Sequence, residues 1–304
     1  MVELKGVIPA LTTPFKEDRS LDLAALRKLT DIVLDDGVDG VLVAGCSGET
    51  WALNDDERLA IFEAAVDQTA GRAPVIGGCG DIFVSGVIDK VRLAERAGCD
   101  AVMITAPPYI MPTQDDIYTF FKEIIAASAM PIMVYNHPKR TGVALSVDLM
   151  DRLADEPTIV ALKESSKDWN QLSQFIRRCR DRISVLGGYI GLTGLAALGE
   201  GAVGYVDSST SVLGPLSPKF FRAATTGDLD TARAIQIQIT KLRPGFDATG
   251  TFPAGIKAAL DILGRPGGWP RDPVKPVTPE GRAIMREVLI DAGILEGEDE
   301  RKRA

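Results

Sequence analysis

The sequence predicts an α/β fold, a (β/α)8 TIM barrel with a C-terminal helical appendage. Three observations lead to this prediction. Eight short apolar runs recur up to residue 207, helical patterns separate them, and only helical patterns follow Phe221. We therefore assign residues 1–225 to a barrel domain and residues 226–304 to a C-terminal helical region.

The eight runs are continuous rather than alternating and are rich in Val and Ile, as expected for parallel strands buried on both faces. They cover residues 6–11, 40–45, 74–78, 101–106, 131–136, 159–165, 183–188 and 201–207. An open, doubly wound sheet is the alternative arrangement. That fold usually carries a glycine-rich turn after its first strand, whereas residues 11–15 read Leu-Thr-Thr-Pro-Phe.

Residues between the runs follow helical spacing. Asn54 is the predicted N-cap of one helix and Thr113 that of another. The predicted buried face of the first is formed by Leu59, Phe62, Ala65 and Val66. After the barrel, helices are predicted over residues 228–242, 253–263 and 279–292, and the charged residues 296–304 are expected to fray.

Composition excludes several classes of protein. The 304 residues are 45% hydrophobic and 25% charged, which is typical of a globular protein and not of a disordered one. A net charge of −8 argues against nucleic-acid binding. The longest charge-free run, residues 183–199, contains five glycines and is too short for a membrane span.

Cysteine and histidine usage narrows the chemistry. The four cysteines form no C-x-x-C pair, so we expect reduced thiols and a cytoplasmic location. The N-terminus has no basic segment followed by an apolar one, so we expect no signal peptide. His137 is the single histidine, so we expect no metal site of the two- or three-histidine kind and a local structural role for its ring.

Lys163 is the candidate nucleophile. It is the only lysine within an apolar strand run, and alternation places it on one face with Ile159 and Ala161. Burial in a barrel mouth lowers the pKa of a lysine, and the neutral amine can attack a ketone to form a Schiff base. The alternative is a structural lysine paired with Glu164.

Other polar residues follow the predicted strands, at the barrel end where active sites lie. Tyr135 ends the strand next to that of Lys163 and could transfer protons, or could simply fill the barrel top. The loop Gly45-Cys46-Ser47-Gly48 could hold a carboxylate with its N–H groups, or could be a tight turn. Arg140 could pair with a carboxylate, or lie in solvent.

Together these motifs resemble the dihydrodipicolinate synthase / N-acetylneuraminate lyase family of Schiff-base aldolases. The likeness covers roughly residues 4 to 265. It is carried by the first strand at residues 6–15, by Gly-Cys-Ser-Gly-Glu at 45–49, by Tyr-Asn-His-Pro at 135–138 and by Lys-Glu at 163–164.

The resemblance implies a lyase that acts on pyruvate or a related 2-oxo acid, uses no cofactor and assembles as a homotetramer, a dimer of dimers. It implies that Lys163 is the nucleophile and Tyr135 the proton shuttle, with Tyr109 joining the relay across a subunit interface. The expected substrate-binding residues are Gly45, Cys46, Ser47, Gly48, Arg140, Gly188 and Val206.

Within the family, Tyr109 and Arg140 match the synthase pattern, which implies aspartate semialdehyde as the second substrate. Cys46 departs from it, because the synthase relay has threonine there and a thiol is a weaker hydrogen-bonding group. Residues 188–191, Gly-Tyr-Ile-Gly, lack the acidic side chains of sialic acid lyases, which argues against that substrate. Asp207 either contacts a polar substrate group or caps the next turn.

Three alternatives stay open. A 2-keto-3-deoxy sugar-acid aldolase or dehydratase of the same family fits the altered relay. A non-catalytic barrel that only binds a 2-oxo acid would share the site. A phosphate- or flavin-binding barrel is suggested by the glycine-rich residues 187–194 near the usual phosphate site of such barrels.

Overall fold

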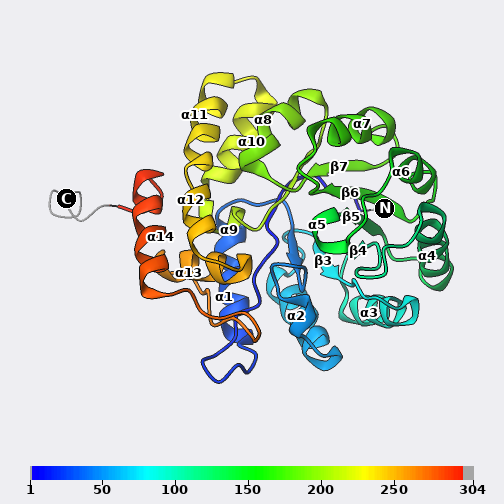
Figure 1. The fold of residues 1–304 in the computed structure, drawn as a ribbon, viewed down its shortest axis with the longest axis horizontal. Helices are drawn as coiled ribbons and strands as arrows, with labels where there is room; N and C mark the ends of the chain where they lie inside the picture. The colour runs from blue at the N-terminus through cyan, green and yellow to red at the C-terminus, as the bar shows by residue number, and fades with distance from the viewer. Residues whose placement is uncertain (1, 297–304) are drawn as a thin grey trace.

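The computed structural model describes residues 2–296 and contains eight strands that alternate with helices (Figure 1). The strands are β1 (Gly6–Ile8), β2 (Val41–Val43), β3 (Val75–Gly78), β4 (Ala101–Thr105), β5 (Ile132–Asn136), β6 (Ile159–Glu164), β7 (Ser184–Gly187) and β8 (Gly204–Val206). Each lies within one of the eight predicted runs. The described strands are shorter than those runs, because the run ends form the turns.

The strands form one parallel sheet in the order β1-β8-β7-β6-β5-β4-β3-β2. The two ends of this order meet where Ala10 pairs with Leu42 in a parallel bridge. On either side of that bridge, the Leu11 N–H donates to the Leu42 carbonyl at 2.8 Å, and the Leu42 N–H donates to the Pro9 carbonyl at 3.0 Å. These contacts close the sheet into a barrel, so the predicted fold class is confirmed.

Helices surround the sheet and cover its outer face (Figure 1). The helices up to β8 are α1 (Leu23–Asp35), α2 (Asp55–Thr69), α3 (Val84–Ala97), α4 (Gln114–Ala127), α5 (Pro138–Thr141), α6 (Val147–Leu153), α7 (Trp169–Cys179) and α8 (Ile190–Glu200), with a 3-10 turn η1 (Thr50–Ala52). Asn54 and Thr113 cap α2 and α4 as predicted, each in a reciprocal capping box.

The predicted buried face of α2 is partly wrong. Phe62 and Ala65 are buried, but Leu59 and Val66 are only half-buried. Arg58 is buried instead, because its guanidinium reaches the carbonyl oxygen of Gly78, at 2.7 Å, at the end of β3. A charged side chain with backbone acceptors at the strand ends is therefore buried, while the neighbouring Leu59, which hydrophobicity predicts to be buried, is only half-buried.

Two hydrophobic clusters lie on the two faces of the sheet. The inner one fills the barrel and includes Ile8, Met103, Met133, Ala161 and Val206. The outer one joins the other face of the strands to the helices. Ile159 belongs to the outer cluster, so the prediction that it shares a face with Ala161 is wrong.

A register shift on β6 explains that error. Ile132 pairs with Ile159, but the next residue, Met133, pairs with Ala161, so Val160 is an extra residue in β6. Such a bulge reverses the alternation on one side of it. From Ala161 onward the alternation is regular, and Lys163 keeps its predicted direction into the barrel.

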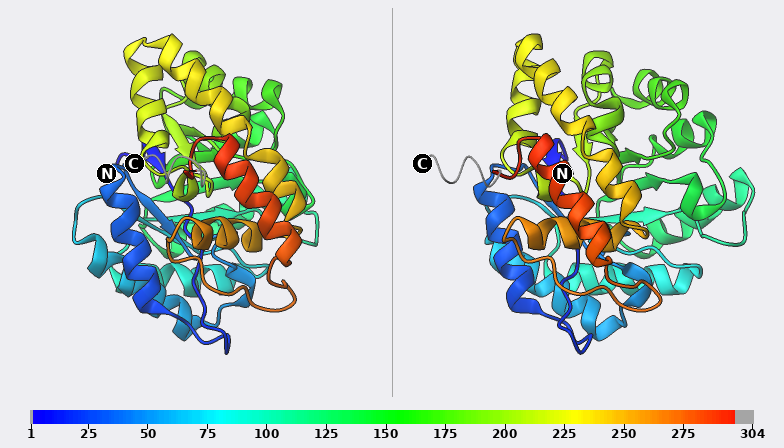
Figure 2. Two further views of the ribbon diagram at one scale, coloured as in Figure 1. Left: turned by 90° about the vertical axis from the view of Figure 1, so that its left-hand side faces the viewer. Right: turned by 60° about the vertical axis from the view of Figure 1, so that its left-hand side comes forward.

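Only helices follow β8 in the described part of the chain. They are α9 (Thr210–Leu213), α10 (Leu216–Thr226), α11 (Leu229–Thr240), α12 (Arg243–Ala248), α13 (Phe252–Ile262) and α14 (Pro279–Asp291). The short α12 was not predicted. Figure 2 shows α13 and α14 packed side by side on one flank of the barrel.

Among residues 2–296, no helix is both long enough and apolar enough to cross a bilayer. The expected fraying of residues 296–304 falls, except for Glu296, outside the described residues.

Candidate active site

Lys163 lies inside the barrel near the end of β6. Its side chain is only 5% exposed, and burial lowers its pKa to about 8, against the opposing charges of Cys46 and Asp207. The Nζ atom makes no hydrogen bond or ion pair with any residue in the described range. The alternative pairing with Glu164 does not form, since that carboxylate accepts hydrogen bonds from Asn136 Nδ2 and the Ser166 N–H, both at 2.6 Å.

Tyr135 is the neighbour of Lys163 across the sheet. The two residues are register partners of β5 and β6, and Lys163 Nζ lies 4.3 Å from the centre of the Tyr135 ring. Burial raises the pKa of the phenol well above its usual value, and the charges of Cys46 and Tyr189 act in the same direction. Tyr135 therefore holds its proton at neutral pH beside an amine that readily loses one.

The loop between β2 and η1 presents backbone donors. The carbonyl oxygens of Gly45 and Cys46 accept from Thr50 and Glu49, both at 3.2 Å, which turns the loop back on itself. Within residues 2–296, the N–H groups of Cys46, Ser47 and Gly48 donate to no protein acceptor. Three successive free N–H groups are a suitable receptor for a carboxylate.

The two glycines of this loop have little space for a side chain. A Cβ on Gly45 would lie 2.6 Å from Leu42 Cδ2, and one on Gly48 would lie 3.1 Å from the Ala44 backbone. Thr13 Oγ1 also donates to the Gly48 carbonyl at 2.7 Å, which ties the loop to the segment after β1. The glycines therefore let the loop pack tightly against β2 and the segment after β1.

A buried ion pair stabilises this loop. Glu49, the residue after Gly48, has a left-handed φ of 55° and pairs with Lys257 of α13. Lys257 Nζ also donates to the Trp269 carbonyl at 2.7 Å, and the Arg271 N–H donates to Glu49 at 2.8 Å. The C-terminal helices thus contact the predicted carboxylate loop through charged groups that are themselves buried.

A second group of side chains lines the mouth next to Tyr135. The His137 ring lies 5.6 Å from the Tyr135 ring, and its Nε2 is 3.5 Å from the Tyr189 hydroxyl. Burial and the nearby charges of Arg140 and Lys163 lower the pKa of His137 to about 4, so the ring is neutral at pH 7. Arg140, on α5, is exposed, which fits both the substrate-binding role and the solvated arginine considered for it.

Gly188 directly follows β7, and Val206 ends β8. The Gly188 N–H donates to the Glu164 carbonyl at 2.7 Å, and a Cβ there would overlap Ser165 Oγ. Val206 is buried in the inner cluster. Asp207 accepts from the Ile190 N–H at 2.9 Å and from the Ser209 N–H at 2.8 Å, which matches the capping alternative given for this residue.

Tyr109 is the predicted site residue that this chain does not bring to Lys163. It lies on the loop after β4, 87% exposed and with a left-handed φ of 76°. The next residues, Ile110 and Met111, are also exposed. No hydrogen bond or ring contact within residues 2–296 connects Tyr109 to the other site residues.

The glycines of residues 187–194 have a packing explanation. A Cβ on Gly191 would lie 3.2 Å from Ile239, and one on Gly194 would lie 3.1 Å from the Phe220 ring. They let α8 pack closely on α10 and α11. The Ile190 N–H at the start of α8 already donates to Asp207, so a phosphate would have to compete with an internal carboxylate.

Metal ligands do not gather at this site. Over residues 2–296, no group of three or more His, Cys, Asp or Glu side chains could hold a metal ion.

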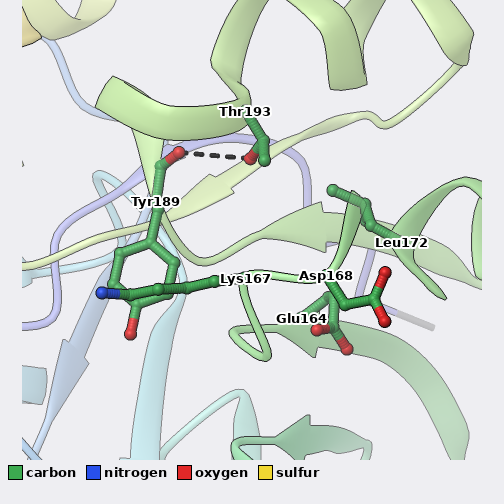
Figure 3. Close-up of a pocket in the computed structure, with 6 residues that line it drawn as sticks. All are labelled: Glu164, Lys167, Asp168, Leu172, Tyr189 and Thr193. Carbon is green, nitrogen blue, oxygen red and sulfur yellow. Dashed lines mark hydrogen bonds between the residues drawn. The ribbon is translucent and has the colours of Figure 1, made fainter. Parts of the chain in front are cut away.

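Sequence reasoning missed Tyr189 as a site residue. The Tyr189 hydroxyl contacts His137, and its ring lies next to Lys167 (Figure 3). The rule that barrel active sites form at the carboxyl ends of strands would have identified it, since it is the second residue after β7. Burial raises the pKa of Tyr189 to about 12.

The dihydrodipicolinate synthetase family matches residues 3–292. The 4-hydroxy-tetrahydrodipicolinate synthase of Desulforudis audaxviator is 33% identical over 294 residues, which cover 97% of this chain and 99% of that protein.

Solved structures agree with this match. Dihydrodipicolinate synthase from Aquifex aeolicus has a TM-score of 0.91 and 33% identity, covering 97% of this chain and 100% of that one. A prophage protein of the dihydrodipicolinic acid synthase family from E. coli K12, crystallised in complex with pyruvate, has a TM-score of 0.93 and 26% identity, with 97% and 100% covered.

Proposed function

Since the chain belongs to the dihydrodipicolinate synthetase family and is a lyase of the lysine Schiff-base type, we propose that it condenses pyruvate with aspartate semialdehyde, the reaction of a 4-hydroxy-tetrahydrodipicolinate synthase. One observation carries the proposal. Lys163 is a buried amine with a lowered pKa and no carboxylate partner, and it lies against a protonated phenol.

Lys163 is the proposed nucleophile. Its neutral amine attacks the ketone carbon of pyruvate, and loss of water from the carbinolamine gives a protonated imine. The imine withdraws electrons, so a proton leaves C3 and an enamine forms, which then adds to the aldehyde carbon of the second substrate. Tyr135 is proposed to transfer protons to and from the carbinolamine oxygen.

The pyruvate carboxylate is proposed to bind the loop of Gly45, Cys46, Ser47 and Gly48. The free N–H groups support this placement, together with the position of Cys46 near both Lys163 and Tyr135. Gly188 is proposed to bind substrate because only a residue without a side chain fits there, and Val206 to form the apolar floor. Arg140 is proposed to bind the carboxylate of the aldehyde.

We also propose a homotetramer, a dimer of dimers, in which Tyr109 reaches the site of a neighbouring subunit. The exposed tip of Tyr109, Ile110 and Met111 supports an interface there, since three adjacent apolar or aromatic side chains are exposed in one chain. The acidic net charge supports a protein without nucleic-acid partners, and the free cysteines support a cytoplasmic location.

A sugar-acid aldolase or dehydratase is the second candidate, favoured by Cys46. The thiol lies near Tyr135, where a hydroxyl would make a stronger proton relay. Replacing Cys46 with threonine tests which of the two candidate functions holds. If the thiol is a tolerated variant of the synthase relay, C46T should have a kcat a few-fold above that of the wild type, since one hydrogen bond contributes about 1 kcal/mol.

The test of function has two steps. Pyruvate and borohydride should add one reduced adduct that maps to Lys163, and K163A should show none while remaining folded. A coupled assay with aspartate semialdehyde should then show turnover. An adduct on another lysine overturns the mechanism, an adduct without semialdehyde turnover favours the sugar-acid alternative, and imine formation without turnover on any aldehyde indicates a binding barrel.

A further inference from the structure

A continuous row of contacts runs outward from the reactive lysine. Lys163 lies on Tyr135, the Tyr135 ring meets the His137 ring, and His137 Nε2 meets the Tyr189 hydroxyl. Lys167 ends the row, with its Nζ 4.9 Å from the centre of the Tyr189 ring. We call Tyr135, His137, Tyr189 and Lys167 the mouth wall. A second substrate that reacts at Lys163 has this wall beside it.

Lys167 is held in place by its loop rather than by a carboxylate. Its backbone has a left-handed φ of 70°, which is unfavourable for lysine and persists only where the surroundings impose it. On one side the Ser166 N–H donates to Glu164, at 2.6 Å. On the other, the Asp168 N–H donates to Ser166 Oγ at 3.0 Å, and Asp168 caps α7.

Figure 3 shows the result of this conformation. The Lys167 side chain lies across the face of the Tyr189 ring, above a small cavity whose other lining residues include Glu164, Leu172 and Thr193. The Tyr189 carbonyl accepts from Thr193 Oγ1 at 3.2 Å, so the base of Tyr189 is anchored as well. The Lys167 ammonium group thus lies at the mouth, against the Tyr189 ring.

Cations gather near the wall although the protein is acidic, and the buried carboxylate of Asp207 also lies near Tyr189. Lys139, Arg140 and Lys167 form no ion pair with any residue in the described range, and Arg243 is paired with Asp247 at 2.7 Å. The charges of Arg140 and Lys167 both lower the pKa of His137. Those of Lys139 and Arg243 both lower the pKa of Lys167. Unpaired cations clustered at a mouth attract and orient anionic ligands.

We propose that Lys167 is a further specificity-determining residue for the second substrate: its ammonium group, held against the Tyr189 ring, binds an anionic group of that substrate. This inference rests on the proposed imine chemistry of Lys163. The pyruvate carboxylate has separate donors in the Cys46–Gly48 loop, so the cations at the wall serve the other reactant. Tyr189 and neutral His137 leave room there for hydroxyl hydrogen bonds.

The experiment compares two aldehydes of equal chain length, succinic semialdehyde and butanal, on the full-length enzyme with pyruvate. The ratio of their kcat/KM values measures recognition of the carboxylate. K167M keeps an aliphatic stem over Tyr189 and should lower the ratio about tenfold or more, since a hydrogen bond to a charged group typically contributes that much. K28M, which removes an exposed lysine without an ion pair on α1, should leave it unchanged.

Two further measurements separate the possible failures. The borohydride adduct on K167M should form at the wild-type rate, and the affinity of the reduced, pyruvyl-labelled enzyme for succinic semialdehyde should fall about tenfold or more by calorimetry. Absence of an adduct on the wild-type enzyme would refute the proposed function. A normal adduct with an unchanged ratio in K167M, or a wild-type enzyme that neither turns over nor binds succinic semialdehyde, would overturn the wall proposal alone.

Discussion

The pH dependence of imine formation tests the environment of Lys163 directly. An ordinary lysine has a pKa of 10.5, and burial lowers that of Lys163 to about 8. At pH 7 about one tenth of Lys163 is then the neutral amine, against roughly 0.03% of an ordinary lysine. Burial therefore raises the reactive fraction by roughly 300-fold, or about 3 kcal/mol.

The assay is rapid-quench trapping with pyruvate and borohydride between pH 6 and pH 10, with the adduct quantified by intact mass. The initial rate should rise tenfold per pH unit up to about pH 8 and level off above it, because the amine is then fully deprotonated. Tyr135 should not disturb this profile, since burial raises its pKa well above the usual value. Circular dichroism at each pH serves as the control for unfolding.

The position of the midpoint decides between a buried and an exposed amine. An exposed lysine would keep a pKa near 10.5, so its rate of imine formation would still rise about tenfold per pH unit as the pH approaches 10. A rate that still rises in this way near pH 10 would refute a buried amine, even if the adduct still mapped to Lys163.

Three further predictions follow from contacts of the site. K257M should lower the free energy of unfolding by about 3–5 kcal/mol in urea titrations, because Glu49 would stay buried without its partner; a loss below 1 kcal/mol would contradict the pairing. G188A should abolish most turnover, since a Cβ there would overlap Ser165 Oγ; wild-type kcat in this variant would show that the turn relaxes freely. EDTA should leave turnover unchanged, as residues 2–296 offer no cluster of metal ligands, and activity lost to chelation and restored by zinc would refute the imine mechanism.

The strands and the position of Lys163 were predictable because they depend on local pattern. A run of apolar residues buried on both faces needs no partner to be recognised. Tyr135 and Lys163 were expected on adjacent strands, and their register pairing follows from consecutive parallel order. The face of Ile159 was not predictable, since the extra residue at Val160 appears only when β6 pairs with β5.

Contacts distant in sequence were out of reach for a different reason. Glu49 and Lys257 are 208 residues apart, and nothing near either residue indicates the other. Arg58 lies on a helix face that hydrophobicity predicts as exposed, and its acceptors belong to the ends of other strands. Lys167 and Tyr189 meet only because the loops after β6 and β7 are neighbours in the closed barrel.

The two buried lysines show why burial alone does not define the nucleophile. Burial lowers the pKa of both Lys163 and Lys257 to about 8. Lys257 has Glu49 and the Trp269 carbonyl as partners, so an electrophile would have to displace a buried ion pair to reach it. Lys163 has neither, and the Cys46–Gly48 loop that lies beside it is held by Glu49. The buried amine of Lys257 thus forms an ion pair that stabilises the loop, whereas the buried amine of Lys163 stays free to act as a nucleophile.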